Sequence, residues 1–106
     1  MNKEISATDA ANLRVQDPTV VLLDVREDSE LEICRIDGAL HIPMGEIPNR
    51  YESLPRKVPL IVLCHHGMRS MNVVQYLTAK GFENTINLAG GIHAWACEVA
   101  PEMRRY

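Results

Sequence analysis

The sequence predicts an α/β fold of three layers, in which a central parallel sheet has helices on both faces. Four short runs rich in apolar residues, 20–23, 39–42, 60–63 and 85–88, have the length expected of buried strands. Helical segments lie between them, and strands that alternate with helices are typical of parallel sheets. With 106 residues, 46% of them hydrophobic, the chain fits a single domain over residues 1–106.

The first two elements in chain order are a helix and a strand. Ser6 can cap the start of the helix with its hydroxyl oxygen, and Pro18 ends the helix. The run 20–23 follows and stops at Asp24, so we expect it to be the first buried strand.

The next segment contains a second strand between two short helical pieces. Residues 27–31 have room for one or two helical turns, and Pro43 stops the strand at 39–42. Residues 44–54 are expected to be helical in part, because Pro48 breaks or opens a helix.

The last part of the chain has the clearest pattern. The most apolar strand, 60–63, precedes a helix predicted over 70–80, where Gly81 suits a left-handed C-cap. The fourth strand, 85–88, leads through two glycines into a helix that extends through Trp95, which we expect to pack in the core.

Cys64 lies where the third strand runs into a short loop and then a helix. A thiol in this position experiences the partial positive charge of the helix N-terminus and unpaired backbone N–H groups. Both favour the thiolate, which is the nucleophilic form of cysteine. We therefore expect Cys64 to be a catalytic nucleophile, although a buried and inert cysteine is the simpler alternative.

The loop after Cys64 predicts a small site for an anion. Four residues separate Cys64 from Arg69, and a loop of this length can curl so that its N–H groups point inward. Arg69 can add a charged donor aimed at an anion or at the sulfur. The residues expected to bind substrate are His65, His66, Gly67, Met68 and Arg69.

Several motifs together resemble the rhodanese-like sulfurtransferase family over nearly the whole chain. They are Leu22-Leu23-Asp24-Val25-Arg26-Glu27, Gly38-Ala39 through Ile42-Pro43, the loop 64–69, and Leu88-Ala89-Gly90-Gly91 with Trp95. The chain departs from the family pattern at Cys34-Arg35-Ile36, where Gly-His-Ile is usual.

The resemblance implies a rhodanese-like fold in which Cys64 accepts sulfur as a persulfide and passes it on by two-step covalent catalysis. It implies a small sulfur-containing anion such as thiosulfate as donor, and a small nucleophile or a protein thiol as acceptor. A carrier or regulatory module that acts on a protein partner is the alternative. A phosphatase or arsenate reductase of the same fold is less favoured, because such relatives have five residues between Cys and Arg.

Other residues near the loop have less certain roles. His65 and His66 are either solvent-facing or cationic groups that tune Cys64 or contact an anionic donor. Asp24, Arg26 and Ser70 are expected to support the loop, with Arg26 paired to an acid such as Glu27 or Glu30. Adjacent residues cannot easily converge on one ion, so we expect no metal site at Cys64, His65 and His66, and no cofactor.

Composition restricts the remaining classes of partner. The net charge is −3 and the basic residues are scattered, so we expect no nucleic-acid partner. No stretch of about 18 apolar residues exists, so we expect no membrane partner. Three cysteines cannot all pair within one chain, and no secretory signal is visible. We therefore expect free thiols and a cytoplasmic location, with Cys34 and Cys97 as bystanders.

Overall fold

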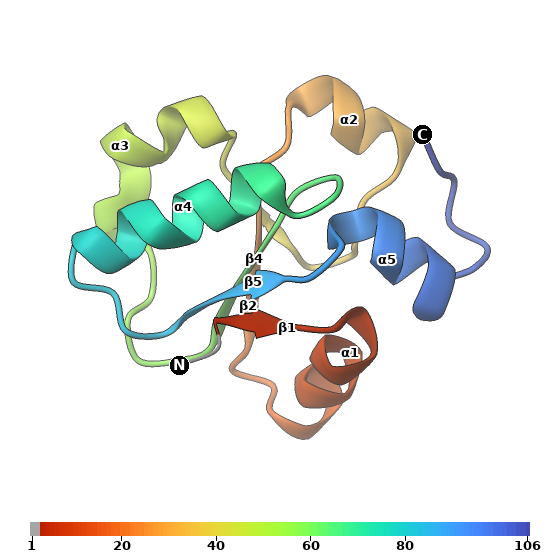
Figure 1. Cartoon of the computed structure of the whole chain (residues 1–106), viewed down its shortest axis with the longest axis horizontal. Coiled ribbons are helices and arrows are strands. Elements are labelled where there is room, and N and C mark those ends of the chain that lie inside the picture. Colours follow the sequence, from red (N-terminus) through yellow and green to blue (C-terminus); the bar gives the residue numbers. More distant parts are fainter. Residues whose placement is uncertain (1–2) are drawn as a thin grey trace.

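A five-stranded parallel sheet in the order β1-β5-β4-β2-β3 forms the centre of the computed structural model, which describes residues 3–106 (Figure 1). The strands are β1 (Glu4–Ile5), β2 (Val21–Asp24), β3 (Leu40–His41), β4 (Leu60–Leu63) and β5 (Thr85–Leu88). The α-helices are α1 (Ala7–Gln16), α2 (Asp28–Ile33), α3 (Ile47–Arg50), α4 (Met68–Ala79) and α5 (Gly91–Glu98). Two short 3₁₀ turns, η1 (Met44–Glu46) and η2 (Tyr51–Ser53), flank α3.

Strand β4 lies in the middle of the sheet and is buried along its whole length. Its register pairs Leu63 with Asp24 of β2 and Val62 with Asn87 of β5. The carboxyl ends of parallel strands meet at one edge of a sheet, which is where ligands bind in such folds. The segment that follows β4 therefore begins between the ends of β2 and β5.

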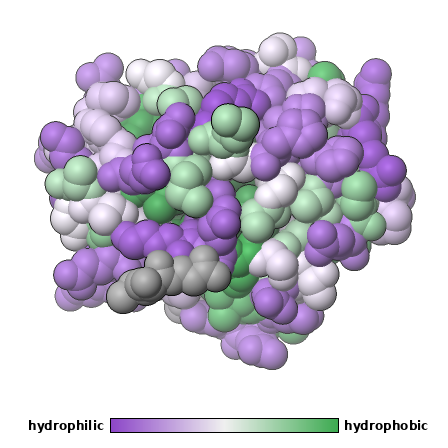
Figure 2. Space-filling view, viewed as in Figure 1, coloured by the Kyte–Doolittle hydropathy of each residue, from purple (hydrophilic) through white to green (hydrophobic). Residues whose placement is uncertain are grey.

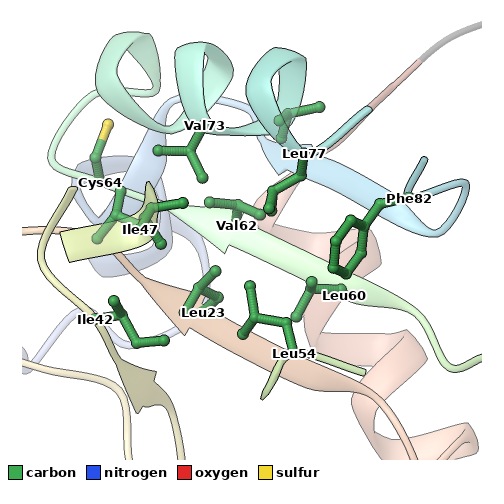
Figure 3. Packing of buried hydrophobic residues seen from close by; sticks show 12 residues of the cluster. Leu23, Ile42, Ile47, Leu54, Leu60, Val62, Cys64, Val73, Leu77 and Phe82 are labelled. Carbon is green, nitrogen blue, oxygen red and sulfur yellow. The ribbon is translucent and has the colours of Figure 1, made fainter. Parts of the chain in front are cut away.

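Helices cover both faces of the sheet, which confirms the predicted three layers. Successive side chains of a strand point to opposite faces. Leu60 and Val62 thus pack in the cluster that contains α4, together with Phe82 (Figure 3). Ile61 packs in the other cluster, with residues of α1 and with Trp95 of α5, so the expected core position of Trp95 is confirmed.

The predicted elements are present, but the structure adds one strand and moves the start of one helix. Strand β1 has only two residues and pairs with β5, so no local pattern marks it. Helix α4 begins at Met68 and not at residue 70, because Gly67 adopts a φ of 106° and caps the helix there. Ser6 caps α1 as expected, accepting a hydrogen bond from the Asp9 N–H.

The surface seen in Figure 2 is mainly hydrophilic, with hydrophobic residues gathered in small areas between the polar ones. Among residues 3–106, no helix is both long and apolar enough to cross a membrane.

Candidate active site

The loop after β4 turns tightly before α4 begins. Gly67 has a left-handed backbone conformation that other residues rarely adopt, and it lies against Gly90 from the turn before α5. Cys64 is 1% exposed and belongs to the hydrophobic cluster that contains residues of α4. Its sulfur is directed toward this loop (Figure 3).

Three donors surround the sulfur of Cys64. The backbone N–H of Gly67 lies 3.1 Å from Sγ, and the backbone N–H and the hydroxyl of Ser70 both lie 3.3 Å away. Ser70 is in the first turn of α4, where N–H groups lack helical partners and the helix dipole is positive. Donors placed in this way stabilise a sulfur that carries negative charge.

Asn87 of β5 organises the donors around Cys64. Its Nδ2 donates to the Gly67 carbonyl and to Glu4, which orients its Oδ1 toward the Ser70 hydroxyl. A hydroxyl has one hydrogen, so Ser70 donates either to Asn87 or to the sulfur. A negative charge on Cys64 favours the second arrangement. Asn87 was not predicted from the sequence, although a polar residue inside an apolar strand was a usable signal.

Arg69 forms an ion pair that sequence reasoning did not anticipate. Its Nη1 and Nη2 donate to the two carboxylate oxygens of Glu30 in α2, at 2.7 and 2.8 Å. The hydrogen bonds from Arg69 are the main reason that the pKa of Glu30 falls to about 2. The same bonds are the main cause of a raised pKa at Arg69, with a smaller contribution from the charge of Cys64. The guanidinium of Arg69 thus points toward the carboxylate of Glu30 in α2.

Asp24 and Arg26 form a buried pair, with side-chain exposures of 1% and 0%. Arg26 donates to both carboxylate oxygens of Asp24 and also to the carbonyls of Glu30 and Cys34, near the two ends of α2. Arg26 thus pairs with an acid, as expected, but the acid is Asp24 and not Glu27 or Glu30. Asp24 and Arg26 hold α2, and α2 in turn carries the partner of Arg69.

Tyr106 lies over this group of charges from the C-terminal end of the described chain. Its hydroxyl donates to Glu30, and it accepts from Arg26 at 3.1 Å. Its ring stacks on His65 with centroids 3.8 Å apart. Burial is the main reason that its pKa rises to about 12, so the hydroxyl keeps its proton at neutral pH. No motif of the sequence marked Tyr106.

His65 and His66 differ in their surroundings. His65 is half-buried beneath Tyr106, and burial, followed by the neighbouring charge of His66, lowers its pKa. His66 is exposed and, with Gly67, Met68 and Glu4, lines a shallow depression of about 390 Å³ beside the loop. Met68 is 81% exposed and presents an apolar side chain there.

A group of three imidazoles whose spacing suits metal ligands also lies beside the loop, and it was not predicted from the sequence. His93 of α5 joins His65 and His66, and one nitrogen from each of these rings lies within 4.8 Å of the others. Cys34, Cys64 and Cys97 are all free thiols, as expected.

Comparisons with known proteins agree with this architecture. A family model described as Rhodanese-like domain matches residues 6–98. The Bacillus subtilis (strain 168) protein YtwF is 42% identical over 100 residues, which cover 94% of this chain and 96% of that protein. Thiosulfate sulfurtransferase GlpE of Tolumonas auensis is 34% identical over 91 residues, covering 86% of this chain and 85% of GlpE.

A solved structure shows the same fold. The crystal structure of a rhodanese-like domain protein from Staphylococcus aureus superposes with a TM-score of 0.84 at 33% identity, covering 98% of both chains. The resemblance noted in the sequence is thus confirmed. The chain belongs to the rhodanese-like sulfurtransferase family.

Proposed function

We propose that this protein transfers sulfane sulfur through a persulfide on Cys64, with thiosulfate or a persulfide as donor. The observation that carries the proposal is the set of three donors to the buried Sγ, all of them from the first turn of α4 or its cap. The two backbone donors are in place before the reaction, so they stabilise negative charge on sulfur without rearrangement. The Ser70 hydroxyl adds to them when its hydrogen turns from Asn87 to the sulfur.

The reaction has two steps. The Cys64 thiolate attacks the outer sulfur of thiosulfate, the S–S bond breaks, and sulfite leaves with the bonding electrons. The resulting persulfide carries its negative charge on the terminal sulfur. An acceptor such as cyanide or a thiolate then attacks that sulfur, and Cys64 leaves as the thiolate again. This sequence is ping-pong covalent catalysis.

Intact-protein mass spectrometry tests the first step. After incubation with thiosulfate, the wild-type protein should gain one sulfur atom and Cys64→Ser should gain none. Cys97→Ser is the matched control, because Cys97 is an exposed free thiol on α5 and should not affect loading. A wild-type protein that stays unmodified with several sulfane donors would overturn the proposal.

Turnover distinguishes an enzyme from a carrier. Steady-state formation of thiocyanate from thiosulfate and cyanide is expected if Cys64 delivers sulfur to small acceptors. Rapid loading of Cys64 without turnover would instead support a sulfur carrier whose acceptor is a protein thiol. The exposed Met68 and the depression beside His66 are where such a protein would make contact.

A further inference from the structure

Three of the four histidines of the chain gather in one place, outside the set of donors to Cys64. The ring centroids of His65 and His66 are 4.0 Å apart, those of His66 and His93 are 5.1 Å apart, and those of His65 and His93 are 6.3 Å apart. His65 and His66 are adjacent in the loop, whereas His93 comes from the first turn of α5.

The backbone holds these two segments together. The N–H of Ile92 donates to the Cys64 carbonyl at 2.8 Å, and the N–H of His93 donates to the His65 carbonyl at 3.1 Å. Gly91 permits this approach, because a Cβ there would lie 2.5 Å from both of these carbonyl oxygens. The three imidazoles are therefore mounted on one rigid unit.

The ring of His65 is also held in place by Tyr106. Tyr106 stacks on it with an angle of 9° between the ring planes, and a side chain held in this way needs little ordering when it binds a ligand. His66 and His93 are exposed, so an ion and its water molecules have access to the group.

The spacing suits a divalent transition metal. Zinc bonds imidazole nitrogen at about 2.0–2.1 Å, which places two such nitrogens about 3.4 Å apart on a tetrahedral ion. The nitrogens here lie within 4.8 Å of one another, so small side-chain rotations bring them to that separation. Imidazole is a preferred ligand of zinc, copper and nickel.

We propose that His65, His66 and His93 form a site for a divalent transition-metal ion such as Zn²⁺, with water in the fourth position. The ion would connect the loop after Cys64 to α5. This site is independent of the sulfur-transfer proposal, because the donors to Cys64 do not include an imidazole.

Calorimetric titration with Zn²⁺ alone tests the site. The thiols of Cys64 and Cys97 can also bind zinc, and Cys97 Sγ lies 3.8 Å from a His93 nitrogen. Cys34 is a third free thiol and lines the same pocket as His65 and His93. The measurement therefore uses the whole chain of residues 1–106 carrying Cys34→Ser, Cys64→Ser and Cys97→Ser. This protein should bind one zinc ion, and adding either His66→Asn or His93→Asn should weaken binding about tenfold or more.

His41 provides the matched control, because it is the remaining histidine and lies on β3. Adding His41→Gln should leave the affinity unchanged. Zinc should also raise the melting temperature of the parent protein by more than that of the His93→Asn variant at the same zinc concentration, since stabilisation by a ligand falls as its affinity falls. Absence of binding to the parent, or an affinity in the His66→Asn and His93→Asn variants equal to that of the parent, would overturn the proposal.

Discussion

Arg69 and Glu30, 39 residues apart in the sequence, form a two-pronged ion pair that ties the start of α4 to α2. Glu30 also closes the capping box of its own helix, and its carboxylate accepts from the hydroxyl of Tyr106. One carboxylate thus connects the loop after Cys64 to two other parts of the chain. The stability of the loop should depend on the charge of this group.

The Glu30–Arg69 pair predicts a defined response to acid. The folded-state pKa of Glu30 is about 2, below its ordinary value of 4.5, so its contribution is fully present above pH 4.5 and is lost as the pH falls toward 2. Glu30→Gln should lower the free energy of unfolding by about 1 kcal/mol at neutral pH, a modest value because Arg69 is partly exposed.

Urea unfolding at several pH values measures this effect. The difference between wild type and Glu30→Gln should shrink as the pH falls below 4.5. Glu46→Gln is the control, because its ion pair with Arg50 lies on the surface. A difference between wild type and Glu30→Gln that does not change with pH would contradict the assignment.

The close approach of Gly91 to the loop after Cys64 predicts that a larger residue at this position lowers the stability of the protein. Alanine there must hold a φ of 62° and place its Cβ 2.5 Å from the carbonyl oxygens of Cys64 and His65. Gly91→Ala should therefore lower the free energy of unfolding by about 2 kcal/mol or more. Gly45→Ala should have little effect, since nothing lies within 4 Å of a Cβ at that position. Thermal unfolding measures the Gly91→Ala and Gly45→Ala variants. Equal stability of these variants would be evidence against the close approach of Gly91 to the two carbonyl oxygens.

The buried Asp24–Arg26 pair predicts a large effect from a single substitution. Asp24→Asn leaves the fully buried guanidinium of Arg26 without its countercharge, which should cost about 3 kcal/mol or more in unfolding free energy. The double variant Asp24→Leu, Arg26→Met removes both charges and should recover part of that loss. Chemical denaturation measures both proteins, and a double variant less stable than Asp24→Asn would contradict this account.

Ser70 predicts a change in the rate of sulfur loading under the proposed function. Ser70→Ala removes the hydroxyl 3.3 Å from the Cys64 sulfur but keeps the backbone donors. Loading from thiosulfate should slow about tenfold, the effect of losing one hydrogen bond to a charged group. Ser53→Ala is the control, because the Ser53 hydroxyl bonds to a carbonyl in an exposed turn. Time-resolved mass spectrometry follows both, and equal loading rates would argue against this role of Ser70.

Much of the fold could be predicted from the sequence because its signals are local. Four apolar runs of strand length, the Ser6 cap and the proline positions each act over a few residues, and the structure confirms those elements. Strand β1 was missed because two residues carry no pattern and its partner, β5, lies about 80 residues away. The family was also predicted correctly, because its motifs recur in order along the chain.

The sequence by itself predicted a centre for the proposed chemistry from Cys64, the four-residue spacing to Arg69 and the start of a helix. Only the tertiary structure decided which side chains surround that centre: Asn87 beside Ser70, Glu30 against Arg69, Tyr106 on His65, and His93 next to His66. The physical reason is distance along the chain. Capping and loop curvature depend on neighbouring residues, whereas these contacts join side chains from separate elements whose positions are set by packing on a common sheet.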